Sequence, residues 1–139
     1  MDKLISGHCL CGKNRFECLQ PPIMSGNCHC RDCQRSNGSP FATLVIFKKL
    51  NVKVIGKHFK NFVDQGGSGK SVLRKFCVEC GSSVFTEYEV TPELIAIMGG
   101  TLNHPHLFPP QWDIYVRSKQ PWVKLAPQLK LFNDGFKRN

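Results

Sequence analysis

Three cysteines lie within the six residues Cys28-His29-Cys30-Arg31-Asp32-Cys33. Three thiolates are one ligand short of a closed tetrahedral zinc site, and zinc sites with three protein ligands keep the fourth position for water or substrate. Cys28, Cys30 and Cys33 therefore predict an open, reactive metal site. Two alternatives remain, a purely structural metal site and a redox dithiol at Cys30 and Cys33. Redox dithiols of this spacing belong to α/β folds, which the strand pattern below does not favour.

Two further cysteine pairs, Cys9-x-Cys11 and Cys77-x-x-Cys80, have the spacing of a zinc site that needs four ligands. Gly7 and Gly12 flank the first pair and Gly81 follows the second, and these glycines allow tight turns that point two sulfurs at one ion. We therefore predict a structural zinc site formed by Cys9, Cys11, Cys77 and Cys80. The alternative is two unrelated pairs of reduced thiols. A closed site would join parts of the chain that lie far apart in the sequence, and zinc binding supplies roughly 10–16 kcal/mol in small zinc peptides.

Disulfides are the competing interpretation of the eight cysteines. Residues 1–6 show no apolar leader with a small-residue cleavage site, and no apolar run reaches the roughly 20 residues of a membrane span. We therefore expect a cytoplasmic protein without a membrane segment, and thiols in that compartment stay reduced. The Cys-x-Cys pairs are also spaced too tightly for easy internal disulfides.

Other residues of ligand type are expected to lie outside the metal sites. His29 projects away from the face shared by its neighbouring cysteines in an extended segment, so a hydrogen bond or a surface position is expected. His104 and His106 form a possible ligand pair in a loop, although such pairs are common. Cys18 is expected to be a small buried apolar residue. The glycine-rich segment 66–71 lacks the first glycine of a phosphate-binding loop and continues as a strand, so we reject that function.

The length of 139 residues indicates one domain, with a core over about residues 4–125 and a loose tail at 133–139. The formal net charge is +9, from 19 Lys and Arg against 10 Asp and Glu. Such a charge suits a nucleic acid or a small anionic substrate. Because the basic residues are spread along the chain, the nucleic-acid interpretation is disfavoured. No pattern in the sequence indicates an oligomeric state.

Short runs with frequent turn signals and no sustained helical period predict an all-β domain. The expected strands lie near residues 14–18, 25–30, 41–47, 52–55, 59–63, 71–77, 83–88, 94–98 and 112–116. One helical turn is expected at 31–35, and a loop at 103–110.

Three motifs in order carry a resemblance to a known family: Gly7-His8-Cys9-Leu10-Cys11-Gly12, Cys28-His29-Cys30-Arg31-Asp32-Cys33-Gln34 and Phe76-Cys77-Val78-Glu79-Cys80-Gly81-Ser82. With them the chain resembles the glutathione-dependent formaldehyde-activating (GFA) family, also called the centromere-protein-V/GFA domain, over about residues 4–125. The resemblance implies a zinc-stabilised β-tent fold of antiparallel sheets with short helical turns and two zinc ions per chain. It matches Cys9, Cys11, Cys77 and Cys80 to the structural zinc, and Cys28, Cys30 and Cys33 to the catalytic zinc.

The family's named reaction joins glutathione and formaldehyde to give S-(hydroxymethyl)glutathione and is classed as a carbon–sulfur lyase. The chain is shorter than the dedicated formaldehyde enzymes and resembles small members whose substrates are mostly unassigned. The resemblance therefore implies a carbon–sulfur lyase acting on glutathione or another small thiol, which takes the fourth position on the second zinc. Arg31, Gln34 and Arg35 are the nearest expected contacts for an anionic substrate.

The alternative is a non-catalytic, zinc-stabilised module that binds nucleic acid or protein. Its support is the net charge together with aromatic residues such as Phe41, Phe59 and Trp112. A base-stacking surface requires these rings to be exposed beside Lys and Arg.

Overall fold

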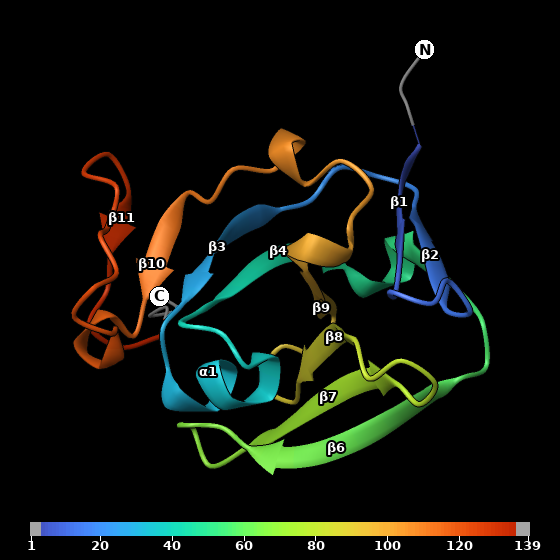
Figure 1. Ribbon diagram of the computed structural model, residues 1–139, viewed down its shortest axis with the longest axis horizontal. Helices are drawn as coiled ribbons and strands as arrows, with labels where there is room; N and C mark the ends of the chain where they lie inside the picture. The colour runs from blue at the N-terminus through green and yellow to red at the C-terminus, as the bar shows by residue number, and fades with distance from the viewer. Residues whose placement is uncertain (1–3, 136–139) are drawn as a thin grey trace.

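The structure, a computed structural model, describes residues 4–135 and consists mainly of strands in two sheets (Figure 1). The strands are β1 (Ile5–His8), β2 (Arg15–Cys18), β3 (Met24–Cys28), β4 (Ala42–Lys48), β5 (Val52–Ile55), β6 (Phe59–Gln65), β7 (Ser71–Cys77), β8 (Ser83–Tyr88), β9 (Leu94–Met98), β10 (Trp112–Ile114) and β11 (Lys130–Leu131). The helical elements are α1 (Arg31–Asn37) and the short 3-10 helices η1 (Lys49–Asn51), η2 (Gly99–Thr101), η3 (Pro105–Leu107) and η4 (Val116–Ser118). The predicted all-β class is confirmed.

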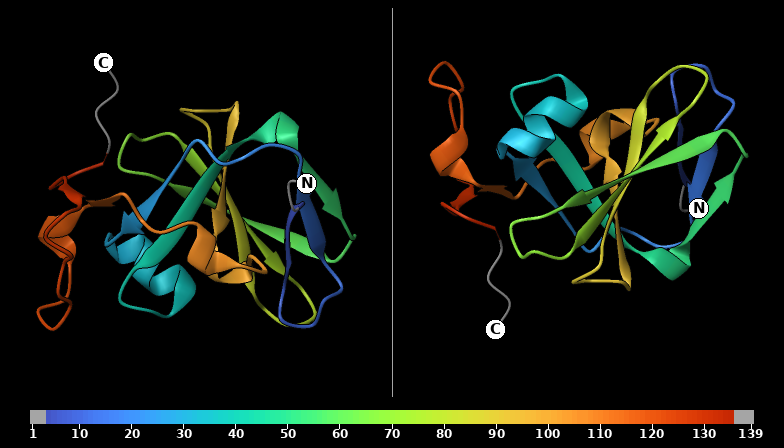
Figure 2. Two further views of the ribbon diagram at one scale, coloured as in Figure 1. Left: turned by 90° about the horizontal axis from the view of Figure 1, so that it is seen from above. Right: turned by 90° about the horizontal axis from the view of Figure 1, so that it is seen from below.

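The larger sheet has the strand order β11-β10-β3-β4-β9-β8-β7-β6, and the smaller has the order β1-β2-β5. The small sheet and β11 lie at opposite ends of the molecule (Figures 1 and 2). Pairing is antiparallel as expected except at one edge, where β3, β10 and β11 run parallel. The connection from β3 to β10 contains most of the chain, so the parallel pairing needs no tight turn.

The large sheet separates two cores because side chains alternate along its strands. Val45 and Phe47 of β4 face a core that includes Phe16 of the small sheet. Leu44 and Ile46 of the same strand face the other side, where they pack with Cys33 of α1. Each face of the sheet is therefore covered by a different element, the small sheet on one side and α1 on the other (Figure 2).

Two element ends differ from the sequence expectation. The helical turn expected at 31–35 extends to Asn37, and Gly38, at φ 60°, caps the helix by donating its N–H to the carbonyl of Gln34. The strand expected at 112–116 ends at Ile114, because Tyr115 adopts a left-handed conformation with φ 54° and ψ 41°. Among the described residues it is the one non-glycine residue with a positive φ.

The expected tail at 133–139 is described only in part. Asp134 accepts a backbone hydrogen bond from Tyr115 and pairs with Arg117 at 2.9 Å. Residues 136–139 lie outside the described residues.

Candidate metal centres

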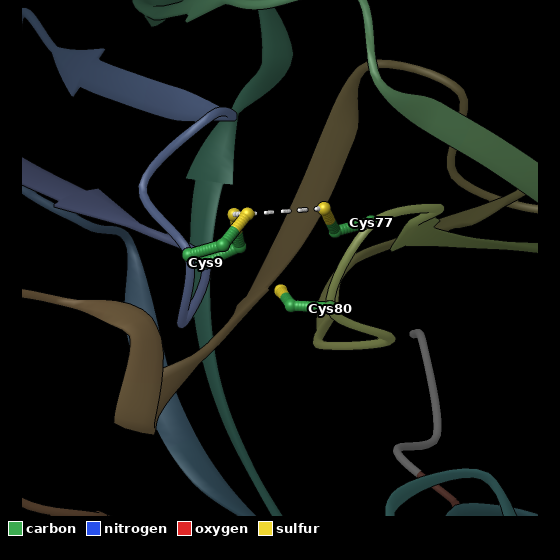
Figure 3. A group of neighbouring side chains, drawn as sticks. Cys9, Cys77 and Cys80 are labelled. Atoms are coloured by element: carbon green, nitrogen blue, oxygen red, sulfur yellow. Dashed lines mark hydrogen bonds between the residues drawn. The ribbon is translucent and has the colours of Figure 1, made fainter.

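Cys9, Cys11, Cys77 and Cys80 bring their four sulfur atoms within 4.8 Å of one another. We call this group the four-cysteine cluster. Cys9 and Cys11 belong to the turn after β1, whereas Cys77 ends β7 and Cys80 follows in the next turn (Figure 3). The Sγ atoms of Cys11 and Cys77 are 3.8 Å apart although 66 positions separate the residues in the chain. The cluster therefore joins the small sheet to the large one.

The local backbone explains how each pair forms. Gly12 and Gly81 have φ values of 79° and 78°, which only glycine adopts without strain, and each follows the second cysteine of its pair. The hydroxyl of Ser82 lies 3.2 Å from Cys80 Sγ and accepts from the backbone N–H of Leu10 at 3.0 Å. Hydrogen bonding from Ser82 lowers the pKa of the Cys80 thiol to about 5. Four sulfurs at these distances fit a tetrahedral structural zinc.

Cys28, Cys30 and Cys33 form a second group, also with all sulfur atoms within 4.8 Å. We call it the three-cysteine cluster. Cys28 ends β3, Cys30 is the N-cap of α1, and Cys33 in the first turn donates its N–H to Cys30 Sγ at 3.3 Å. Hydrogen bonding with Cys28 lowers the pKa of the Cys30 thiol. Within residues 4–135 the group includes no fourth His, Cys, Asp or Glu, and its donor set fits a divalent ion with one position left for another ligand.

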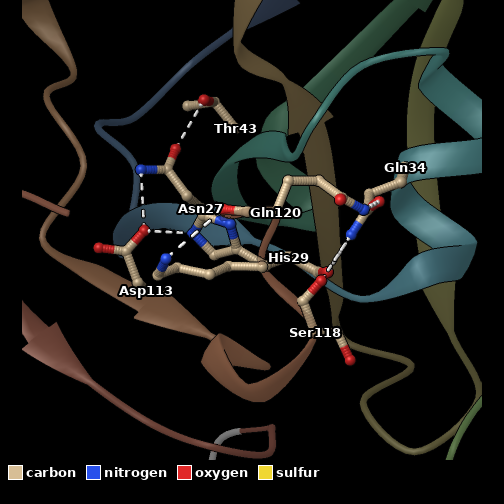
Figure 4. A network of polar contacts seen from close by, with 8 residues as sticks. Asn27, His29, Gln34, Thr43, Asp113, Ser118 and Gln120 are labelled. Atoms are coloured by element: carbon tan, nitrogen blue, oxygen red, sulfur yellow. Dashed lines mark hydrogen bonds and ion pairs between the residues drawn. The ribbon is translucent and has the colours of Figure 1, made fainter. Parts of the chain in front are cut away.

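The imidazole of His29 lies away from the three sulfurs and makes the expected hydrogen bond. His29 Nε2 is 2.7 Å from Asp113 Oδ1, and His29 is only 1% exposed, so the alternative of a surface position is wrong. Asn27 donates to the same carboxylate oxygen at 3.3 Å and accepts from Thr43 at 2.7 Å (Figure 4). This buried network fixes the peptide that joins Cys28 to Cys30.

Sequence reasoning missed three side chains that surround the three-cysteine cluster. Arg74 of β7 lies beside Cys33, with its side chain 13% exposed. Tyr88 and Tyr115 pack against the core that contains Cys28 and Cys33. Burial, together with the nearby sulfurs, raises the pKa of both phenols, so both stay protonated at neutral pH. Arg74 carries no motif, and only the strand order reveals that its face of β7 meets α1.

The predicted substrate contacts lie on the outer side of α1. Arg31, Gln34 and Arg35 line a surface cavity of about 390 Å³ together with Gly38, Ser39, Pro40, Gln120 and Trp122. The amide of Gln34 is already used: its Nε2 donates to the carbonyls of His29 and Ser118, and its Oε1 accepts from Gln120 and Arg31. Gln34 therefore orders the wall of this cavity, whereas the two arginines are exposed and face solvent.

The remaining sequence candidates lie elsewhere. Cys18 is 2% exposed in the first core, as expected. His104 and His106 are exposed in the loop around η3, with ring centroids 6.0 Å apart, and belong to neither cysteine cluster. The glycine-rich segment 66–71 leads from β6 into the strand β7. This agrees with our rejection of a phosphate-binding loop, which would lead into a helix.

Comparison with known proteins places the chain. The model of one family, the glutathione-dependent formaldehyde-activating enzyme (GFA), matches residues 4–118. The chain belongs to the GFA family. Both cysteine clusters lie within the matched residues, as do Arg74, Tyr88 and Tyr115, whereas Gln120 and Trp122 of the surface cavity follow them. This membership agrees with the resemblance carried by the cysteine motifs.

The GFA chain is also similar in fold to a Rhodobacter sphaeroides protein of known crystal structure, a structural genomics target. The two share 20% sequence identity and a TM-score of 0.55, over 70% of this chain and 87% of that one. No curated protein matches the GFA chain. Among residues 4–135, no helix has the length and apolar character needed to cross a membrane.

Proposed function

We propose that the protein is a zinc-dependent carbon–sulfur lyase that adds a small thiol, such as glutathione, to an aldehyde such as formaldehyde and reverses that addition. The observation that carries the proposal is the three-cysteine cluster, whose sulfurs converge within 4.8 Å without a fourth protein ligand in the described chain. Zinc bound there would act as a Lewis acid that favours the thiolate form of a thiol substrate. The four-cysteine cluster would hold a second, structural zinc.

The reaction balances without another reactant. The substrate sulfur forms a bond to the aldehyde carbon while the carbonyl π bond opens, and the thiol proton ends on the former carbonyl oxygen. The reverse reaction breaks the same carbon–sulfur bond. No oxidant or reductant is consumed.

The residues of the chain supply position and charge. Cys28, Cys30 and Cys33 hold the ion, and the His29–Asp113 hydrogen bond fixes the peptide between the first two of them. Arg31 and Arg35 line the surface cavity beside α1, where their charges suit the carboxylates of glutathione. The cavity is large enough for part of a small ligand.

The aromatic residues named for a nucleic-acid module do not form a stacking surface. Trp112 is 4% exposed and packs in the second core, and Phe41 and Phe59 are half-buried. Stacking on single strands needs exposed rings. These three rings therefore give the nucleic-acid alternative no support.

The proposal is tested by calorimetric titration of the zinc-loaded protein with glutathione, with S-methylglutathione as the matched ligand that lacks a thiol. We expect binding of glutathione alone, and its loss in a variant with Cys28, Cys30 and Cys33 all replaced by Ser that still folds with one zinc. Exchange NMR on glutathione and formaldehyde should then show faster adduct formation than the uncatalysed mixture. Binding of both ligands alike, or no binding by the wild type, would overturn the proposal.

A further inference from the structure

Arg74 connects the large sheet to α1 next to the three-cysteine cluster. Its Nη1 donates to the hydroxyl of Ser36 in α1 at 3.3 Å, and its Nε lies 3.5 Å from Asp64 Oδ2 on β6. The same Ser36 hydroxyl donates to the backbone carbonyl of Cys33 at 3.3 Å, so the guanidinium is held one hydrogen-bonded residue away from Cys33. A guanidinium this well covered loses much of its hydration, so it needs negative charge nearby.

The charges around the three-cysteine cluster indicate which negative charge the Arg74 guanidinium meets. Three cysteine thiolates and one divalent ion sum to −1, and an incoming substrate thiolate makes the sum −2. Of the groups packed around the cluster, Tyr88 and Tyr115 are phenols, which carry no charge at neutral pH, and His29 is turned toward Asp113. Arg74 is a cation close enough to act on the charge of both Cys30 and Cys33. Asp64 offsets Arg74 only in part, because its carboxylate is 3.5 Å from Nε and 29% exposed, so solvent screens the pair.

We propose that Arg74 determines specificity at this centre: its guanidinium offsets the charge of an anionic sulfur substrate beside Cys33 and so favours a thiolate over a neutral ligand. The inference rests on the proposed function. It assigns a role to a residue outside the cysteine motifs and outside the surface cavity. Under the proposed function the carboxylates of glutathione would contact Arg31 and Arg35, so a thiol without carboxylates should depend on Arg74 as strongly as glutathione does.

The experiment compares three ligands by calorimetry on zinc-loaded protein: glutathione, 2-mercaptoethanol, which is a thiol without carboxylates, and imidazole, which is neutral. In Arg74→Met we expect both thiols to bind about tenfold more weakly, which corresponds to about 1.4 kcal/mol, and imidazole to change by less than about twofold. Arg74→Lys, which keeps the charge, should restore much of the thiol affinity.

Lys75→Met is the matched control. Lys75 follows Arg74 in β7 and points through the opposite face of the sheet, where it pairs with Glu87 at 2.9 Å. This variant removes the same charge on the other side of the sheet, so its thiol affinity should stay near that of the wild type. Zinc content and urea unfolding of each variant show whether the fold and both metal centres are retained.

The outcomes separate the two proposals. Unchanged thiol binding by Arg74→Met, with binding intact in the wild type, overturns the role of Arg74 and leaves the proposed function standing. Loss of glutathione binding alone would assign Arg74 to the carboxylates instead, and equal loss of all three ligands together with zinc would make it purely structural. If the wild type binds neither thiol, the proposed function fails and the role of Arg74 fails with it.

Discussion

His29 and Asp113 form a buried pair in which Nε2 lies 2.7 Å from Oδ1, although 84 residues separate them in the chain. Each residue is 1% exposed. The pair links the segment after β3 to β10, whose parallel pairing brings Asp113 opposite Asn27. Because His29 stands between two cysteines of the three-cysteine cluster, the position of those sulfurs depends on a strand from the far end of the sequence.

Replacing Asp113 by Ala should destabilise the protein strongly. The change removes the acceptor for both His29 and Asn27 and leaves buried donors without a partner, which costs roughly 3–5 kcal/mol in buried pairs. The free energy of unfolding in urea is the measurement. Asp32→Ala, at an exposed carboxylate in the first turn of α1, should cost less than about 1 kcal/mol. Equal losses for the two variants would show that the buried pair contributes little.

Removing metal should affect the two clusters differently. Cys77→Ser should lower the unfolding temperature far more than Cys33→Ser, because only the four-cysteine cluster joins residues 66 positions apart across the two sheets. Structural zinc contributes roughly 10 kcal/mol in small domains, so the first variant should approach the limit of folding. Thermal unfolding with and without a chelator gives the comparison. A chelator that leaves the wild-type unfolding temperature unchanged would contradict this role of the four-cysteine cluster.

Glu87 predicts a pH dependence of stability. Burial alone would raise the pKa of this carboxyl, but hydrogen bonds from Lys49 and Lys75 outweigh burial and hold the pKa below its ordinary value of 4.5. A lowered folded-state pKa adds stability that is complete above pH 4.5 and is lost as the pH falls through the folded value.

Glu87→Gln should therefore lower stability by roughly 1 kcal/mol at neutral pH and flatten its fall below pH 4.5. Urea unfolding across pH 3–7 measures both effects. Glu89→Gln is the control, because Glu89 is exposed and the Gln side chain keeps an oxygen that can accept from the Ser71 N–H; it should keep the wild-type slope. The same slope in Glu87→Gln as in the wild type would assign the acid loss to other carboxyls.

Gly26→Ala should break the packing that brings β10 to β3. A Cβ at Gly26 would lie 2.0 Å from Cε3 of Trp112, its direct partner in the parallel pairing. Overpacking of this kind costs roughly 1–3 kcal/mol, and it should also disturb Asp113, the next residue along β10. Gly100→Ala, where no heavy atom lies within 4 Å of the added Cβ, is the matched control in urea unfolding. Equal stability of the two variants would contradict a tight contact at Trp112.

The parts that sequence could predict depend on local spacing. Alternating residues located most strands, and the short distances between cysteines placed Cys28, Cys30 and Cys33 together before any fold was known. A closed zinc site needs four ligands and each cysteine pair supplies two, so the sequence predicts that Cys9 and Cys11 join Cys77 and Cys80. In each case the spacing or the number of ligands left few other ways to group the residues.

The parts that sequence could not predict depend on which strands become neighbours. β11 consists of Lys130 and Leu131 alone and forms only because β10 offers an edge. Arg74 carries no motif, and its place beside Cys33 arises from the order of β7, β8, β9 and β4 beneath α1. Gln34 was expected to contact substrate, but the carbonyls that hold its amide come from residues whose positions only the fold defines.

The two clusters also differ in when they can form during synthesis of the chain. The three-cysteine cluster is complete in the chain once residue 33 has been synthesised. The four-cysteine cluster is complete only once residue 80 has been synthesised, on the order of seconds later. The strand that carries Asp113 follows later still. A nascent chain therefore exposes all the reactive thiols to metal before the four-cysteine cluster is complete, because Cys77 and Cys80 come later than Cys33, and the geometry of the reactive thiols is fixed last.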